Sequence, residues 1–428
     1  PMMISMLVQA LYNIVDSIFV AKLSENALTA VSLAFPLQTL LIAVATGTGV
    51  GMNALLSKVL GERRSDEADK IAVNAAFIYF LSYLVFLILG FTIVKPFYAS
   101  QIGTADAEIM EMGIDYLRTV MIFSFGLLSQ IFFERLLTST GRTIFSMTSQ
   151  LCGAITNIIL DPIFIFAFHM GVKGAALATI LSQAVSTIWV VRFLCGNKTQ
   201  IHLRRKYMRL QPKVFLPCVA LGLAAFIMQA SESIVAVCFN SSLLRYGGDI
   251  AVGTMTILTS VMQFAMLPLQ GIAQGSQPIS SYNYGAKNAD RVKKTFRLLV
   301  ITCLTYSVIF WIIVQLIPNV FVSLFTSDGA LVAFAAPMLR IYMGGMLLFG
   351  IQIACQMTFT SLGRAVNSIV VAVVRKFVLL IPLIYIIPHA VSNPTVGVYM
   401  AEPIADIIAV LFTSILFAFA FRKALAEI

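Results

Sequence analysis

Long apolar runs recur along this whole chain, and they constrain its fold more than any other feature. Of the 428 residues, 59% are hydrophobic and 11% are charged, whereas soluble domains are about 45–50% apolar and about 25% charged. A membrane-spanning helix needs about 20 mostly apolar residues. We therefore predict a polytopic membrane protein. A soluble enzyme, a disordered chain and, despite the net charge of +10, a nucleic-acid-binding module are excluded.

The apolar runs are separated by polar turns that contain glycine and charged residues, as at Gly141-Arg142 and Gly363-Arg364. Each run is continuously apolar, which favours helices over the alternating pattern of membrane β-strands. The predicted fold is therefore all-α, with twelve transmembrane helices. The runs cover residues 1–22, 27–57, 71–94, 113–138, 143–168, 172–194, 214–241, 250–276, 295–322, 332–361, 366–388 and 395–421.

Lysine and arginine are unevenly distributed between the two sides of this layout. Lys22, Lys95, Lys173 and Arg245 fall in odd-numbered connections, while nearly all the other basic residues fall in even-numbered ones or near the C-terminus. Cytoplasmic loops are enriched in basic residues, so we expect both termini in the cytoplasm. Because Pro1 opens directly on an apolar run, we also expect further residues upstream of it in the natural chain.

The sequence repeats itself at a spacing of roughly 222 residues. Residues 138–142 (TSTGR) match residues 360–364 (TSLGR), and Leu117-Arg118 matches Leu339-Arg340. Each repeat holds six spans, so we predict two six-helix lobes related by a pseudo-two-fold axis along the membrane normal. This is the usual frame for alternating access. The predicted lobes are residues 1–195 and 214–428, joined by a basic cytoplasmic linker at 196–213.

Acidic residues inside the apolar runs are candidates for a functional site, because a charge at mid-bilayer costs about 2.5–3.5 kcal/mol. We place only Arg118 and Arg340 within spans against them, so we predict an acidic interior that favours cations. Glu134 is expected to form a simple ion pair with the neighbouring Arg135. The acidic candidates are Asp16, Glu134, Asp161, Glu232, Glu402 and Asp406.

Four side chains from the first, fifth and sixth predicted spans lie at a similar depth. Asp16, Asp161 and Thr179 are each six or seven residues from a span end, and Asn157 is one helical turn from Asp161 on the same face. At 1.5 Å per residue this places them about 10 Å from the outer surface. The set predicts a binding site for a proton or for a hard cation such as sodium. The alternative is a hydrogen-bonded network that only holds the helices together.

The second lobe carries a different set of acids. Glu232, Glu402 and Asp406 reach similar outer-half depths, and Asp406 lies one turn from Glu402 on the same helix face. We expect these residues to contact substrate or to form a second proton site. The alternative is a set of local hydrogen bonds to Ser231, Ser233 or Asn240.

Together these residues resemble the multidrug and toxic compound extrusion (MATE) family of secondary transporters, over essentially the whole chain. Asp16 and the polar positions before it resemble that family's first-helix signature. Residues 157–162 (NIILDP) are similar to its fifth-helix motif, and Pro1 resembles its bend proline. The sequence looks closest to the bacterial branch that contains the DNA-damage-inducible and MepA-like exporters.

The resemblance implies a transport protein of the bacterial inner (plasma) membrane, not an enzyme, with no cofactor beyond the coupling ion. The expected partners are small organic cations and membrane lipid, not nucleic acid, and we expect a monomer. The coupling ion is a proton or sodium, with sodium the metal that this site would bind. The implied coupling site is Asp16, Asn157, Asp161 and Thr179, with polar support on the first helix from Gln9, Tyr12 and Asn13.

We therefore predict a secondary active antiporter that exports amphipathic organic cations in exchange for protons or sodium ions by alternating access. The alternative is a lipid-linked oligosaccharide flippase of the same superfamily, which would need basic residues in its cavity to hold a pyrophosphate. The excess of buried acids argues against the flippase, while Arg118 and Arg340 keep it open. The chain has no P-loop and no CxxC pair, so the sequence indicates neither an ATPase nor a metal cluster.

Overall fold

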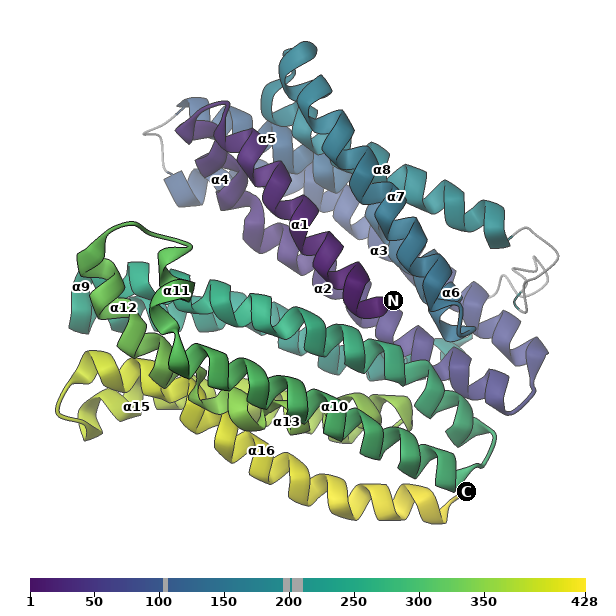
Figure 1. The fold of residues 1–428 in the computed structure, drawn as a ribbon. Coiled ribbons are helices and arrows are strands. Elements are labelled where there is room, and N and C mark those ends of the chain that lie inside the picture. Colours follow the sequence, from purple (N-terminus) through teal and green to yellow (C-terminus); the bar gives the residue numbers. More distant parts are fainter. Residues whose placement is uncertain (103–106, 195–200, 202–210) are drawn as a thin grey trace. The chain divides into compact units, whose positions relative to one another are not determined.

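The computed structural model describes residues 1–102, 107–194, 201 and 211–428, and every regular element in that part of the chain is a helix (Figure 1). The described residues group into two compact units, Pro1–Phe226 and Ile227–Ile428. The predicted all-α fold is confirmed. Apart from Ile201 and residues 211–213, the basic linker predicted at 196–213 lies outside the described residues.

The first unit is built from helices that match the first six predicted runs. The fourth of these spans is bent, because α5 and α6 meet at 42°. Its fifth span continues from α7 into a π-helix, η1. The elements are α1 (Met2–Ala21), α2 (Glu25–Gly61), α3 (Ser65–Thr92), the short α4 (Val94–Ile102), α5 (Ala107–Ile122), α6 (Phe125–Ser139), α7 (Thr143–Pro162), η1 (Ile163–Ala167) and α8 (Gly171–Leu194).

The second unit follows the other six runs, and it begins within α9 (Pro212–Gly285). That element is two helices joined at Gly248, whose backbone is not helical (φ 65°, ψ −162°). The other elements are α10 (Ala289–Leu316), the short α11 (Pro318–Ser323), α12 (Gly329–Tyr342), η3 (Met343–Gly345), α13 (Met346–Ser361), α14 (Ala365–Val373), the π-helix η4 (Val374–Leu380), α15 (Ile381–Ala390) and α16 (Pro394–Ala426).

These helices account for the predicted twelve spans. Within the described residues, 10 helical segments are long and apolar enough to cross a membrane, and the bent pair α5 and α6 makes an eleventh. Since α9 enters that count once but contains two helices, the total is twelve. Several helices are longer than the predicted runs, with α2 reaching 37 residues.

The internal repeat is visible as two equivalent connections. Gly141 (φ 79°) and Gly363 (φ 75°) both adopt the left-handed conformation that glycine tolerates best, directly after α6 and α13. Beside them, Ser57 Oγ donates to the carbonyl oxygen of Ser139 at 3.2 Å, and Ser281 Oγ donates to that of Ser361 at 2.9 Å. The two halves therefore share local hydrogen bonds as well as sequence.

Backbones approach closely where α2 meets the beginning of α9. A Cβ added at Gly51 would lie 1.9 Å from the carbonyl oxygen of Cys218, and one added at Gly222 would lie 2.1 Å from that of Gly47. Only glycine allows this contact. Residues 212–226 therefore pack as part of the first unit, although the basic stretch that precedes them suggested a boundary at 213.

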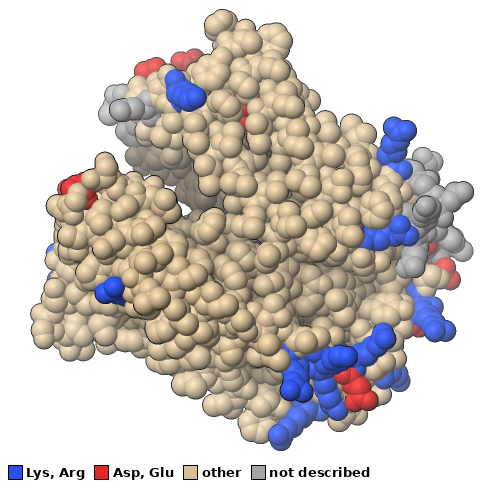
Figure 2. All heavy atoms as spheres, in the orientation of Figure 1, with Lys and Arg blue, Asp and Glu red and all other residues tan. Residues whose placement is uncertain are grey.

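The outer faces of the helices are apolar. Large hydrophobic side chains remain more than half exposed on several spans, for example Ile88, Ile188 and Phe419. Figure 2 shows that most of the visible surface carries no charge, and that lysine and arginine gather near the end of α16. A surface of this kind is expected to face lipid.

Candidate functional site

Asn157 and Asp161 lie one turn apart on α7, and neither side chain is exposed. Asn157 Nδ2 donates to Asp161 Oδ1 at 3.3 Å. The remaining oxygens, Asn157 Oδ1 and Asp161 Oδ2, are buried without a hydrogen-bond partner. Leaving such atoms unpaired costs about 1–3 kcal/mol each, so this pair is prepared to receive a proton, a cation or water.

Asp16 approaches the same region from α1, which packs against α7 and α8. Its Oδ1 atom is also buried without a hydrogen-bond partner. The carboxylates of Asp16 and Asp161 lie within range of a direct Coulomb interaction. Two carboxylates repel each other when both are charged, so a bound cation or proton would relieve the repulsion.

Thr179 lies on α8, a helix that packs on both α1 and α7. Its hydroxyl donates to the carbonyl oxygen of Ala175 at 3.1 Å, within its own helix. The hydroxyl oxygen keeps a lone pair that can face a cation. The structure therefore brings Asp16, Asn157 and Asp161 to one region and places Thr179 on the adjoining helix.

Two polar residues near this region were not singled out from the sequence. Gln38 Nε2 on α2 donates to the hydroxyl oxygen of Tyr116 on α5 at 2.9 Å. The Tyr116 hydroxyl interacts electrostatically with both Asp16 and Asp161. Each residue lies in an apolar run with no motif around it, so only the packing of α2 and α5 reveals the pair.

The polar residues of the first helix make mainly local contacts. The Tyr12 hydroxyl hydrogen-bonds with the Gln9 side chain and interacts electrostatically with Asp16. The Asn13 side chain is exposed, and its carbonyl oxygen accepts from Ser17 Oγ at 2.9 Å. Tyr12 is therefore the member of this group that reaches the environment of Asp16.

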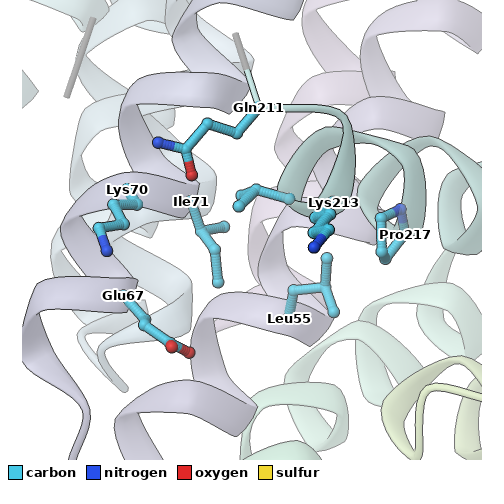
Figure 3. Close-up of a pocket in the computed structure, with 8 residues that line it drawn as sticks. Leu55, Glu67, Lys70, Ile71, Gln211, Lys213 and Pro217 are labelled. Carbon is cyan, nitrogen blue, oxygen red and sulfur yellow. The ribbon is translucent and has the colours of Figure 1, made fainter. Parts of the chain in front are cut away.

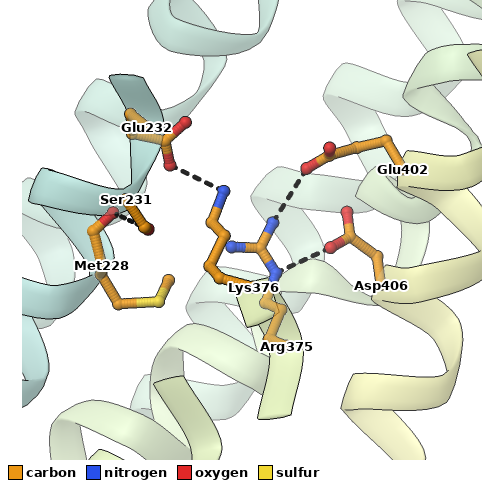
Figure 4. A network of polar contacts seen from close by, with 7 residues as sticks. All are labelled: Met228, Ser231, Glu232, Arg375, Lys376, Glu402 and Asp406. Carbon is orange, nitrogen blue, oxygen red and sulfur yellow. Dashed lines mark hydrogen bonds and ion pairs between the residues drawn. The ribbon is translucent and has the colours of Figure 1, made fainter. Parts of the chain in front are cut away.

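The second unit contains a network of five charged side chains (Figure 4). Arg375 donates through Nε to Asp406 Oδ1 at 2.8 Å and through Nη2 to Glu402 Oε1 at 3.2 Å. Lys376 Nζ lies 2.7 Å from Glu232 Oε1. The bases come from η4, two acids come from α16, and Glu232 comes from α9. We call these five residues the unit-2 charge network.

The prediction that Arg118 and Arg340 are the only basic residues within spans is wrong. Arg375 and Lys376 lie near the middle of the segment Ala365–Ala390, and both are buried. Arg135 is also largely buried, on α6. Burying a carboxylate is costly unless a positive charge is buried beside it. Here Arg375 and Lys376, from the same unit, provide that positive charge.

The acids of the second lobe form these ion pairs, and not the local hydrogen bonds that were the alternative interpretation. Ser231 Oγ instead donates to the carbonyl oxygen of Met228 at 3.0 Å. In the first unit, Glu134 accepts from Gln130 Nε2 at 3.0 Å and from Gln150 Nε2 at 2.8 Å. These two amides hold the carboxylate that was expected to pair with Arg135.

A small cavity of about 280 Å³ lies between α2, α3 and the beginning of α9 (Figure 3). None of its lining residues belongs to the group around Asp16 and Asp161 or to the unit-2 charge network. It is lined by Leu55, Glu67, Lys70, Ile71, Gln211, Lys213, Val214 and Pro217.

Within the described residues, no three His, Cys, Asp or Glu side chains are grouped to hold a metal ion. A sodium ion at Asp16 and Asp161 would therefore depend on amide and hydroxyl oxygens as well. Asn157 Oδ1 is buried and has no hydrogen-bond partner. Hard cations accept neutral oxygen ligands of this kind. The donor set therefore fits a proton or a sodium ion.

Two repeated six-span units with charged residues buried inside their spans are typical of a membrane transport protein, rather than an enzyme. The chain belongs to the MatE family, whose model matches residues 1–163 and 224–386. The two matched stretches fall on the two repeated halves. They confirm the resemblance seen in the sequence.

Similar proteins extend over nearly the whole chain. Multidrug export protein MepA of Staphylococcus saprophyticus is 25% identical over 419 residues, which cover 97% of this chain and 92% of that protein. MepA of Staphylococcus aureus strain N315 is 26% identical over 387 residues, covering 90% and 85%. These matches place the chain in the MepA-like branch of the family.

Solved structures show the same fold. The MATE multidrug transporter DinF-BH, solved as a complex, is 31% identical, with a TM-score of 0.89, and the match covers 99% of this chain and 94% of that one. The outward-facing form of a multidrug resistance MATE transporter of the MOP superfamily is 24% identical, with a TM-score of 0.92 over 100% and 95%. The chain is therefore a multi-pass membrane protein with the MATE architecture.

Proposed function

We propose that this protein is a secondary antiporter that exports amphipathic organic cations in exchange for protons or sodium ions by alternating access. The relatives named as multidrug exporters support the export of small molecules. The observation that carries the proposal is the group of buried, unpartnered oxygens on Asp16, Asn157 and Asp161. We further place the protein as a monomer in the bacterial plasma membrane, with both termini in the cytoplasm.

The coupling follows from electrostatics at the first-unit site. A proton or sodium ion that binds between Asp16 and Asp161 cancels their repulsion and satisfies the unpaired oxygens, with Thr179 as a neutral ligand. Binding therefore favours the conformation in which α1 and α7 pack most closely. An inward-moving charge supplies about 2.3 kcal/mol per 100 mV. Ion and cargo need only favour different conformations for each to weaken the other's binding.

Cargo recognition in the second unit rests on Glu232. Its side chain is 55% exposed, whereas Glu402 and Asp406 are 6% and 1% exposed and are held by Arg375. An open carboxylate in an apolar wall attracts an amphipathic cation. Of the three acids expected to contact substrate or to form a second proton site, we therefore propose Glu232 as the cargo contact.

The alternative of a lipid-linked oligosaccharide flippase gains one supporting observation, because Arg375 and Lys376 are basic residues inside the bundle. However, both are paired with carboxylates of the same network. The network contains three acids and two bases, so it offers no net positive charge to a pyrophosphate. Accumulation of a lipid-linked precursor in a deletion strain, with drug sensitivity unchanged, would favour the flippase.

The coupling site is tested by Asp16→Asn and Asp161→Asn, which keep the side-chain shape and remove the charge. We expect both variants to reach the membrane as folded, monodisperse protein and to lose ethidium efflux from cells. Asp290→Asn is the matched control, since that side chain is 97% exposed in the first turn of α10; it should keep full efflux. Retained efflux in both site variants would exclude this site.

The coupling ion is identified by transport measurements in proteoliposomes. Proton and sodium gradients are imposed separately, and the uptake of ethidium is followed under each. We expect one gradient to drive accumulation in the wild type and neither to do so in Asp16→Asn. Equal transport without any gradient would mean that the protein is not an antiporter.

A further inference from the structure

We propose that Lys376 is a built-in competitor for the cationic cargo: it occupies the Glu232 carboxylate when no cargo is bound and so sets the affinity of the second unit for organic cations. The inference rests on the proposed function, because it assumes that the cargo carries a positive charge.

The first argument is the unequal exposure of the two partners. Lys376 Nζ lies 2.7 Å from Glu232 Oε1, yet the lysine side chain is 3% exposed while the glutamate is 55% exposed. A cation arriving at the open side of Glu232 thus meets a carboxylate that already has a positive partner behind it (Figure 4). To form a close ion pair of its own, the cargo must weaken or replace that contact.

The second argument is the contrast between the two bases of η4. Arg375 makes two hydrogen bonds to buried acids, and its guanidinium lies 4.5 Å from the centre of the Phe349 ring. These contacts fix a planar group in several directions. Within the described residues, Lys376 has one ion-pair partner, Glu232. A flexible ammonium with one partner is the member of the network that can be displaced.

The third argument is that a displaced lysine would not be left without a counter-charge. Lys376 also interacts electrostatically with Glu402, and Asp406 Oδ2 is buried without a hydrogen-bond partner. The network has one more acid than it has bases. When cargo takes Glu232, the ammonium of Lys376 can turn toward the two acids of α16, so the buried charge remains compensated.

This arrangement predicts how cargo affinity depends on residue 376. Removing the lysine charge frees Glu232 and makes the network more negative, so a cation should bind more tightly. Replacing lysine with arginine should strengthen the internal pair, because guanidinium and carboxylate can form two hydrogen bonds, and should weaken cargo binding. Removing the Glu232 charge should abolish cargo binding at this site, whether residue 376 is lysine or glutamine.

The experiment measures ethidium binding to the purified full-length protein in detergent by fluorescence anisotropy. We expect Lys376→Gln to bind about tenfold more tightly than wild type and Lys376→Arg to bind several-fold more weakly. Glu232→Gln and the double variant Glu232→Gln/Lys376→Gln should both bind at least about tenfold more weakly than wild type. Lys287→Gln, which removes one exposed lysine charge from a connection of the same unit, is the control and should match wild type.

Thermal unfolding of each variant shows whether it is folded. If Lys376→Gln does not fold, Lys376→Arg decides alone, because it keeps the charge: ethidium binding equal to or tighter than wild type overturns the inference. Unchanged or weaker binding by a folded Lys376→Gln also overturns it, and the pair is then structural. If wild type binds and exports ethidium but Lys376→Gln behaves like wild type, only this inference fails. If wild type neither binds nor exports ethidium, the proposed function fails with it.

Discussion

Arg375 is a residue whose role depends on partners far away in the sequence. Its guanidinium holds Asp406 and Glu402, which follow by 31 and 27 positions. The spacing of the two acids already put them on one helix face, and the sequence shows a basic pair inside an apolar run. The missing information was the direction of η4, whose π-helical geometry aims both bases inward.

Arg375→Met should destabilise the protein strongly. It leaves two carboxylates buried without their counter-charge, and removal of one member of a buried ion pair typically costs about 3–5 kcal/mol. Thermal unfolding in detergent measures the loss. The triple variant Arg375→Met/Glu402→Gln/Asp406→Asn should recover most of it. If the single variant were as stable as wild type, the network would contribute nothing to folding.

A second residue-scale contact gives a pH dependence outside the membrane. Glu427 Oε2 lies 2.5 Å from Arg364 Nη2. The hydrogen bond from Arg364 and the positive charge of its guanidinium lower the pKa of Glu427 below its usual value. A lowered carboxyl pKa stabilises the folded state above the unfolded pKa, and the contribution is lost as the pH falls through the folded pKa. The contact is partly exposed to solvent, so its effect on stability is small.

We expect the backbone amides of residues 421–428 to be best protected from hydrogen exchange near neutral pH. Protection here means slowing relative to the intrinsic exchange rate at the same pH. This protection should be lost in acid. Glu427→Gln should show the acid behaviour already at neutral pH. Hydrogen-exchange mass spectrometry compares the two proteins between about pH 3.5 and 7, around the ordinary glutamate pKa of about 4.3. Identical pH profiles would show that the contact with Arg364 does not hold the end of α16.

The candidate coupling site was predictable in part. Asn157 and Asp161 are four positions apart, so helical geometry alone places them on one face, and they are indeed hydrogen-bonded. That Asp16 lies in the same region was inferred from depth in the membrane. Gln38 and Tyr116 are 78 positions apart. Their contact depends on how α2 packs on α5, which no local pattern encodes.

At the scale of the elements, the apolar runs of the sequence predict that the helices exist. The bends and π-helical segments that interrupt them depend on how the helices pack. The sequence predicts every span but not the bend between α5 and α6 or the two π-helices, because each replaces only a few backbone hydrogen bonds within an apolar run. Close helix contacts depend on single glycines, and these provide a direct test of the packing.

Gly51→Ala should destabilise the first unit, because the new Cβ would lie 1.9 Å from a backbone oxygen of α9 that cannot move aside alone. Overpacking of this kind typically costs about 1–3 kcal/mol. Gly253→Ala is the matched control: nothing lies within 4 Å of its Cβ position, and alanine favours helix, so its stability should be unchanged or slightly higher. Thermal unfolding in detergent compares them. Equal stability of the two variants would contradict the contact.

At the scale of the whole molecule, the two repeated halves share their connections but not their charges. Equivalent serines and glycines occupy equivalent turns, so the repeat was readable from the sequence. Among the described residues, Asp16 and Asp161 of the first unit have no ion-pair partner, whereas the acids of the unit-2 charge network are paired with Arg375 and Lys376. In the function that we propose, this division gives ion coupling to the first unit and cargo selection to the second.

The distribution of basic residues predicts the orientation of the whole chain. We expect a reporter that is active only in the cytoplasm, fused after Ile428, to be active, and one that requires export to be inactive. The reverse orientation should appear in fusions to the connection at residues 168–170, just before Lys173. Activity of the export-dependent reporter at the C-terminus would contradict the topology inferred from Lys and Arg.

The π-helix η4 has a consequence for anyone comparing or redesigning this segment. A π turn takes up about one residue more than an α turn, and successive residues of an α-helix are rotated by about 100°. An alignment or redesign that treats residues 365–390 as one regular helix would therefore aim every side chain after Leu380 in the wrong direction. The parts of this segment before and after η4 have to be aligned as two separate helices. The division between them falls at η4, which carries Arg375 and Lys376.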